Sequence, residues 1–229
     1  MSDKEVEQRF INIDTIKFRK TLKKVGAKLI NPKRIMPLMV FNHPRNKKDS
    51  YIRIRDEGKQ ITLTSKTNLK DKYVTEYEVE IDNFEQGIKI LNSLGCKIRY
   101  YIEKIRETWV LPGCKEIVID SYPGLAEYIE IDCHSEKSLN KAIRMLGLDG
   151  EENDVDHGKD KFGVQYMYWE QYGIPIKRNI SGDLTFKNGK KVLGPHVKKN
   201  KKIFNTIIKQ QKELYTKEQL QLIKQINSI

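Results

Sequence analysis

The strongest constraint on the fold of this chain is a charge pattern that recurs in four short stretches. Charged residues alternate with mostly uncharged ones in residues 5–9, 53–55, 76–80 and 104–106. In a β-strand, side chains two residues apart lie on the same face, so each stretch places its charges on one side of a strand. A closed barrel that turns these faces inward, with helices covering its apolar outer faces, would collect charges of both signs in one tunnel.

The rest of the chain supplies enough strands and helices for such a barrel. Alternation and turn signals predict strands around residues 38–41 and at residues 4–11, 51–55, 60–66, 73–81, 97–111, 116–120 and 127–133. Helical spacing predicts helices over residues 14–26, 82–95, 135–146 and 161–172, and a last helix from Thr216; Asp14, Asp82 and Ser135 are the expected caps of the first three. We therefore expect an α+β fold: a closed eight-stranded antiparallel β-barrel with peripheral helices.

The composition is that of a globular protein rather than a membrane protein. Hydrophobic residues make up 38% of the chain and charged residues 32%, and no stretch approaches the roughly 20 apolar residues of a membrane span. The first residues lack the apolar run of a signal peptide. We predict a cytoplasmic protein with no membrane partner. The three cysteines, Cys96, Cys114 and Cys133, lack metal-ligand spacing, and we predict that all are reduced and structural.

The positive charge of the chain is concentrated near its C-terminus. The formal net charge is +12, and residues 177–212 hold eleven Lys or Arg residues against one acid, Asp183. Such a segment attracts polyanions, so an RNA contact through residues 177–212 is one interpretation; a solvated basic surface is the other. The change in composition suggests a boundary between residues 1–175 and a basic C-terminal extension, residues 176–229, that ends in a helix.

The charged stretches also resemble the motifs of a known family. Glu5-x-Glu7-x-Arg9 resembles the ExExK signature of the CYTH group, the triphosphate tunnel metalloenzymes, which includes class IV adenylyl cyclases, thiamine triphosphatases and inorganic tripolyphosphatases. Five further elements resemble family motifs in the same order: residues 51–55, 63–66, 76–78, 102–106, and Asp120 with 124–132. Two departures keep the charge: Arg9 stands where the family has lysine, and Asp132 where it has glutamate. The resemblance implies that residues 1–175 form a triphosphate tunnel domain.

The chemistry of the charged residues agrees with this resemblance. Alternation places six basic residues on the faces that carry the acids, where they would bind a triphosphate: Arg9, Arg53, Arg55, Lys66, Lys104 and Arg106. Five carboxylates supply hard oxygen ligands for Mg²⁺ or Mn²⁺: Glu5, Glu7, Asp120, Glu130 and Asp132. The residues expected to act most directly in catalysis are Glu5, Glu7, Arg9, Lys104 and Arg106. The resemblance adds Lys161 as a phosphate contact and a tunnel wall formed by Glu76, Glu78 and Glu80.

Three functions fit these residues. The leading prediction is metal-dependent hydrolysis of a triphosphate: tripolyphosphate, thiamine triphosphate, a nucleoside triphosphate or the 5′ end of an RNA. The alternative is a class IV adenylyl cyclase, which makes cyclic AMP and pyrophosphate from ATP. A non-catalytic module that binds triphosphates or RNA ends is less favoured, because anion binding alone would not need so many carboxylates. The family resemblance also allows a homodimer.

Overall fold

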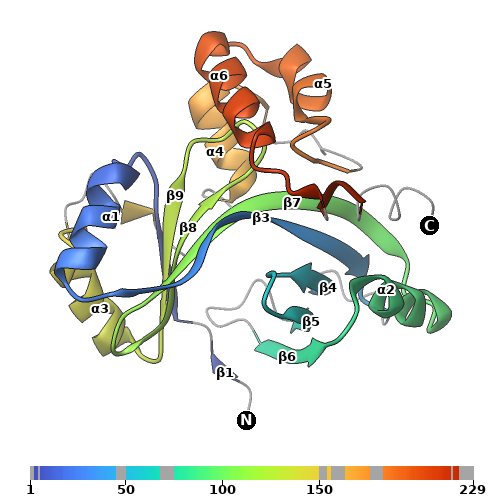
Figure 1. The fold of residues 1–229 in the computed structure, drawn as a ribbon, viewed down its shortest axis with the longest axis horizontal. Coiled ribbons are helices and arrows are strands. Elements are labelled where there is room, and N and C mark those ends of the chain that lie inside the picture. Colours follow the sequence, from blue (N-terminus) through green and yellow to red (C-terminus); the bar gives the residue numbers. More distant parts are fainter. Residues whose placement is uncertain are drawn as a thin grey trace.

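The computed structural model describes most of the 229-residue chain and is built around one curled antiparallel sheet (Figure 1). The described residues are 3–4, 6–44, 50–67, 75–149, 154–155, 163–175, 183–217 and 219–221. Among them, eight strands of four or more residues form the sheet: β2 (Glu7–Phe10), β3 (Lys28–Asn42), β4 (Ser50–Asp56), β5 (Ile61–Thr67), β6 (Thr75–Ile81), β7 (Ile98–Val110), β8 (Cys114–Ser121) and β9 (Tyr128–Cys133).

The N-terminal segment joins the two edges of this half-barrel. The strand order is β1-β6-β5-β4-β3-β7-β8-β9-β2-β10, in which β1 (Asp3–Lys4) and β10 (Asp154–Val155) have two residues each. β1 pairs with β6 and β2 pairs with β9, so these two short strands, close in sequence, lie against strands from opposite edges of the curled sheet. The predicted α+β fold with eight antiparallel strands is confirmed, and its closure depends on this N-terminal segment.

Helices cover the outside of the sheet and the turn between β8 and β9 (Figure 1). The helices bounded within the described residues are α1 (Thr15–Lys24), α2 (Phe84–Ser93), α3 (Glu136–Met145), α4 (Val164–Tyr172), α5 (Gly189–Leu193) and α6 (Lys201–Lys212). Asp14 and Ser135 cap α1 and α3 as predicted, but Asn83 rather than Asp82 caps α2, because its side chain accepts the Gln86 N–H. None of the helices in the described residues could span a membrane.

The apolar faces of the strands form the core, as the alternation predicts. Phe10, Ile117 and Ile131 pack with Leu22 of α1 and Leu139 of α3, and Trp109 lies buried in the same cluster. A second cluster places α2 against β3 and β4. A third joins α4, α5 and α6 to Leu125 and Tyr128 near the β8–β9 turn. Because the apolar faces are covered from outside, the charged faces turn inward.

Two elements extend beyond the sequence prediction. β3 begins at Lys28, about ten residues before the predicted strand, and its pairing with β7 has a register shift between Asn31 and Arg34, the interval that contains Pro32. Such irregularities allow a proline inside a strand. The basic segment contains α6, which was not predicted. Its buried residues Phe204, Ile208 and Gln211 follow helical spacing, but the exposed lysines around them obscure the pattern.

The prediction that all three cysteines are reduced is wrong for two of them. Cys114 and Cys133 form a disulfide that joins β8 to β9. They are direct partners in the β8–β9 register, and this pairing could not be seen from two cysteines 19 residues apart. Cys96 is free and buried, as predicted.

Gly124, in the turn between β8 and β9, should not tolerate a side chain. Its φ is +82°, and a Cβ atom would lie 2.3 Å from Cε2 of Phe204 in α6. We expect Gly124→Ala to lower the free energy of unfolding by about 2–4 kcal/mol, combining left-handed strain with overpacking. Urea unfolding would measure the loss.

Gly147→Ala is the matched control, because Gly147 also has a positive φ (+67°) but a Cβ there would meet nothing within 4 Å. It should lose about 1 kcal/mol, from backbone strain alone. Equal losses in the two variants would contradict the close packing of α6 on this turn.

Candidate active site

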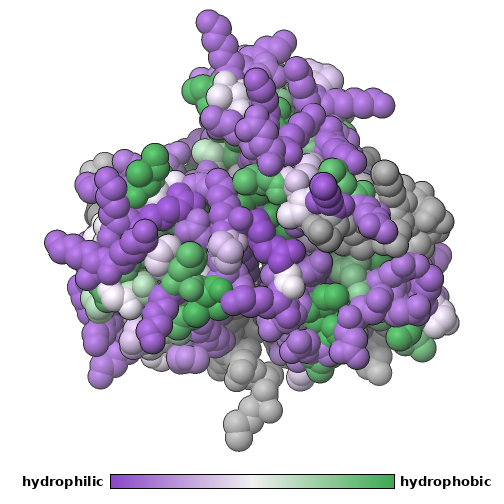
Figure 2. Space-filling model, in the orientation of Figure 1, coloured by the Kyte–Doolittle hydropathy of each residue, from purple (hydrophilic) through white to green (hydrophobic). Residues whose placement is uncertain are grey.

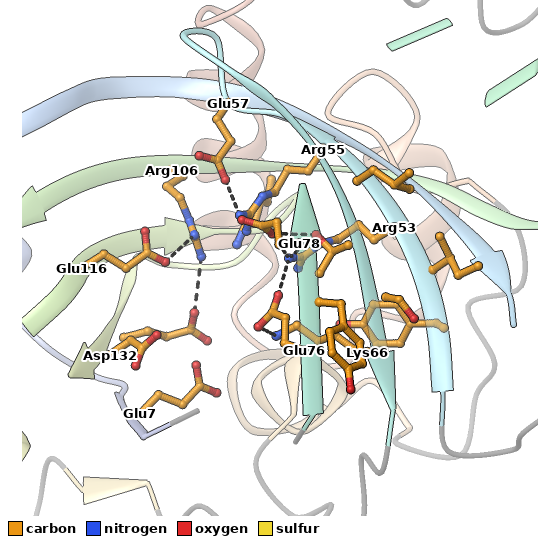
Figure 3. Close-up of a pocket in the computed structure, with 18 of the residues that line it drawn as sticks. Glu7, Arg53, Arg55, Glu57, Lys66, Glu76, Glu78, Arg106, Glu116 and Asp132 are labelled. Atoms are coloured by element: carbon orange, nitrogen blue, oxygen red, sulfur yellow. Dashed lines mark hydrogen bonds and ion pairs between the residues drawn. The ribbon is translucent and has the colours of Figure 1, made fainter. Parts of the chain in front are cut away.

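A cavity of about 970 Å³ lies within the curl of the sheet and is lined mainly by charged side chains (Figure 3). Its walls come from β2 and from β4 to β9. The structure brings to this cavity the six basic residues that alternation places on the faces carrying the acids: Arg9, Arg53, Arg55, Lys66, Lys104 and Arg106. They share this space with Lys115, which was not predicted, and their role in phosphate binding stays a prediction.

The buried carboxylate of Asp120 binds two of these cations, Lys104 and Arg106. Asp120 is 0% exposed; its Oδ2 accepts from Nζ of Lys104 at 2.7 Å and from Nη2 of Arg106 at 2.7 Å. Nε of Arg106 donates to Oδ1 of Asp120 at 2.8 Å, which makes the arginine contact bidentate. The two residues can meet because Arg106 and Asp120 are direct partners in the β7–β8 register. Burial opposes ionisation, but Arg106 and Lys104 hold the pKa of Asp120 below its usual range.

For Lys104, unlike Asp120, burial outweighs the attraction of the opposite charge. Its pKa is lowered to about 8, first by burial and then by the nearby charge of Arg106, although Asp120 counteracts both. Lys104 therefore loses its charge as the pH rises through about 8, well below the usual range for lysine.

Arg9 and Glu130 form the next pair along the cavity wall. They are direct partners in the β2–β9 register, and Nε of Arg9 donates to Oε1 of Glu130 at 2.8 Å. Nη2 of Arg106 lies 3.5 Å from the other oxygen of Glu130. Burial would raise the pKa of Glu130, but Arg9, Lys104 and Arg106 keep it below the usual value despite the neighbouring Asp120. Glu130 is thus an ionised carboxylate engaged by arginine.

On the opposite wall, β4 and β5 carry cations that face the acids of β6. Lys66 Nζ lies 3.1 Å from Oε2 of Glu76, and Arg53 Nη2 lies 3.5 Å from Oε1 of the same residue. Arg55 pairs with Glu57 and approaches Glu78 at 3.6 Å. The Nε atoms of Arg53 and Arg55 are buried and have no hydrogen-bond partner within the described residues. These unused donors are suited to an anionic ligand.

Three carboxylates lie side by side across β8, β9 and β2. Asp132 is the register partner of Glu116 on one side and of Glu7 on the other, and Figure 3 shows the three near one another at one side of the cavity. Their hard oxygen atoms are the donors that Mg²⁺ and Mn²⁺ prefer. In the residues that the structure describes, no group of three or more His, Cys, Asp or Glu side chains is gathered closely enough to hold a metal ion. The donor chemistry of Glu7, Glu116 and Asp132 thus fits a divalent cation, whereas their spacing in this structure does not by itself form a metal site.

The remaining predicted residues fall into three groups. Glu5 and Lys161 lie outside the described residues. Glu76 and Glu78 line the cavity, while Glu80 lies on the same strand and does not. Asp120 and Glu130, predicted as metal ligands, are engaged with lysine and arginine as described above, and their role as ligands stays a prediction.

Several lining residues were missed by sequence reasoning. Glu57 pairs with Arg55 from the end of the β4 hairpin, and Tyr122 and Tyr128 line the cavity at the β8–β9 turn. Glu116 and Tyr128 could have been found by alternation, because they lie in phase with Asp120 and Glu130, respectively. Tyr122 follows the end of β8, so no strand alternation predicts its direction.

Comparison with known proteins agrees with the fold. The family model named CYTH domain matches residues 3–154. Three solved structures share the fold at TM-scores of 0.52 to 0.59: the PH1012 protein of Pyrococcus horikoshii, a conserved hypothetical protein of Pyrococcus furiosus, and a candidate adenylate cyclase of Vibrio parahaemolyticus. No curated protein matches the chain.

Sequence identity to these structures is low. It is 20% for the P. horikoshii protein (TM-score 0.54), 26% for the P. furiosus protein (0.52) and 12% for the V. parahaemolyticus protein (0.59). The alignment covers 67% of this chain and 96% of the P. horikoshii protein, 66% and 94% for the P. furiosus protein, and 69% and 96% for the V. parahaemolyticus protein. The family model spans most of the chain and includes every strand of the sheet up to Asp154. This protein therefore belongs to the CYTH domain family.

Proposed function

We propose that this protein hydrolyses a triphosphate with the help of a divalent cation. The observation that carries the proposal is the balance of charges around the cavity, which is lined by seven Lys or Arg residues and by seven Asp or Glu residues. Walls of nearly zero net charge would not by themselves neutralise a triphosphate. A divalent cation that enters with the substrate would supply the missing positive charge. The CYTH family acts on triphosphates and is generally metal-dependent, which supports this interpretation.

Glu7 and Asp132, with Glu116 beside them, are the residues that would hold the cation. When bound, a divalent ion of this kind stabilises charge on phosphate oxygens and makes water a better nucleophile. The chain's own contribution is to position the phosphate groups. Arg53 and Arg55 offer buried donors, and Asp120 holds Lys104 and Arg106 in place before substrate arrives. Such preorganised charge is the main source of catalysis in phosphoryl transfer.

Several substrates and two ions fit the cavity. Tripolyphosphate, thiamine triphosphate, a nucleoside triphosphate and an RNA 5′-triphosphate all present the same group to the cavity, and Mg²⁺ and Mn²⁺ both suit the oxygen donors. A class IV adenylyl cyclase needs the same charges, so cyclic AMP formation is the alternative reaction. The homodimer and the cytoplasmic location also stay predictions.

Product analysis decides between these reactions. We expect purified protein with Mg²⁺ or Mn²⁺ to release orthophosphate from ATP, thiamine triphosphate or tripolyphosphate. Glu7→Gln should lower the rate about 10²-fold, because it removes one preorganised charge from the site. Glu85→Gln, on the outer helix α2, is the matched control and should behave as wild type.

Two other outcomes of this assay would indicate a different function. Cyclic AMP and pyrophosphate as products would establish a cyclase instead of a hydrolase. Triphosphate binding without turnover, for any substrate and either ion, would favour the non-catalytic binding module.

The lowered pKa of Lys104 predicts a pH dependence of binding. Below pH 8 the ammonium group is protonated and attracts phosphate; as the pH rises through about 8 the charge is lost. Affinity for a non-hydrolysable imido analogue of tripolyphosphate should therefore fall by up to about tenfold per pH unit above this value. Calorimetric titration with Mg²⁺ present would measure it.

Lys104→Arg controls for titration of the ligand itself, because a guanidinium keeps its charge across this range. In this variant the fall should be clearly shallower. The same slope in both proteins would show that Lys104 does not control the pH dependence.

An RNA contact through residues 177–212 is supported by the lysines in the described part of that segment. All of them are exposed, and no ion pair within the described residues neutralises them: Lys187, Lys190, Lys191, Lys198, Lys199, Lys201, Lys202, Lys209 and Lys212. Figure 2 shows hydrophilic side chains across this face, above the rest of the molecule.

Salt dependence tests this contact. Affinity for a short RNA that carries a 5′-triphosphate should fall more steeply with salt than affinity for tripolyphosphate. Reversing the charges of Lys201 and Lys202 to glutamate should weaken RNA binding several-fold and leave tripolyphosphate binding unchanged. Equal salt slopes for the two ligands would indicate a solvated basic surface with no RNA contact.

A further inference from the structure

The C-terminal extension is joined to β7 next to the cavity. The Glu103 N–H donates to the Leu184 carbonyl at 3.0 Å, and the Leu184 N–H donates to the Tyr101 carbonyl at 3.0 Å. The Tyr101 N–H donates to Oδ1 of Asp183 at 2.8 Å. The β7–β8 pairing begins only at Ile105, so residues 183–184 use the edge of β7 that β8 leaves open. The extension thus continues the wall of the barrel.

Glu103 connects the extension to the strand that carries Lys104. Its carboxylate is 1% exposed and accepts three hydrogen bonds: from the Tyr101 hydroxyl at 3.1 Å, from the Phe186 N–H at 3.0 Å and from the Tyr215 hydroxyl. Two of these donors belong to the extension. Neighbouring side chains of a strand point to opposite faces, so Glu103 faces the extension while Lys104 faces the cavity. The contacts of Glu103 therefore restrain the backbone that positions Lys104.

Gln211 of α6 makes a second buried connection, to the turn between β8 and β9. Its Nε2 donates to Oγ of Ser121 at 2.7 Å, to the Tyr122 carbonyl at 3.0 Å and to the Leu125 carbonyl at 3.2 Å. Its Oε1 accepts the Gly124 N–H at 2.7 Å. One side chain thus bonds to four groups of a turn that directly follows Asp120 and contains Tyr122, a cavity-lining residue.

From these two connections we infer that the extension supports the active site, with Tyr215 and Gln211 as positioning residues. Tyr215 acts through Glu103, and Gln211 acts through the 121–125 turn. Both thereby hold the strands that carry Lys104, Arg106 and Asp120. The inference rests on the proposed function and goes beyond it, because the family match ends at residue 154 and includes neither residue. Neither side chain is among the cavity-lining residues, so each acts through a residue that is closer to the phosphates.

Tyr215→Phe is the mildest test, because it removes one hydroxyl from Glu103 and keeps the ring that packs against Phe186. We expect the variant to remain folded, with kcat for the best triphosphate substrate about tenfold lower at saturating substrate. A small displacement of a positioned group commonly costs this much or more. Thr206→Val is the matched control: it removes a hydroxyl that donates to the Lys202 carbonyl on the exposed side of α6, and its kcat should equal that of wild type.

A double-mutant cycle with Lys104→Arg separates positioning from general destabilisation. If Tyr215 acts through Lys104, its removal should lower kcat only about twofold in the Lys104→Arg background, because the group that it positions has already been replaced. The same tenfold loss in both backgrounds would overturn the inference. So would an unchanged kcat in Tyr215→Phe, or a loss of activity that matches a loss of folded protein by circular dichroism.

The outcome is distinguishable from failure of the proposed function. Wild-type protein that turns over no triphosphate would refute the hydrolase itself. Active wild-type protein with an unaffected Tyr215→Phe variant would refute the positioning role alone.

Discussion

The buried contact of Asp120 with Lys104 and Arg106 is the interaction on which the rest of the site depends. An ionised carboxylate that is 0% exposed would cost several kcal/mol if it were alone. Here two cations offset that cost, and one of them binds it through two parallel hydrogen bonds. This triad requires the β7–β8 register that sets Arg106 opposite Asp120. A one-residue slip would turn these charges toward the apolar outer layer, so the electrostatics of the cavity and the register of the sheet stabilise each other.

The same pairing supports the proposed need for a divalent cation. Each basic residue that lines the cavity has a carboxylate near it, which keeps the arginines and lysines ordered. This order leaves little net positive charge to attract a polyanion. Arg55 is an example of these opposing effects. Burial, Arg53 and Arg106 lower its pKa, and the nearby Glu57 and Glu78 raise it. A divalent ion at Glu7 and Asp132 would add positive charge on the side of the cavity where acids outnumber bases.

Much of this arrangement could be predicted from the sequence, because alternation along a strand determines which side chains share a face, whichever strands it pairs with. The eight strands and the shared cavity of Arg9, Arg53 and Lys104 follow from it. Pairing across strands could not be predicted, since it depends on register. Glu130 therefore looked like a free metal ligand although Arg9 lies directly opposite, and the Cys114–Cys133 disulfide was missed for the same reason. α6 was missed because its apolar stripe is short and its other faces carry lysine.

The basic C-terminal extension makes buried contacts with the part of the chain that precedes it. The basic character of the chain changes near residue 175, which favours a boundary there, yet the contacts of Glu103 and Gln211 cross it. Without residues 183–219, the carboxylate of Glu103 would lose two of its three hydrogen-bond donors, and the Gly124 N–H would lose its acceptor, Oε1 of Gln211. Unsatisfied buried groups cost about 1–3 kcal/mol each, and more when charged. The matched family span of this chain, taken alone, would therefore have to rearrange around the strand and turn that hold its central ion triad.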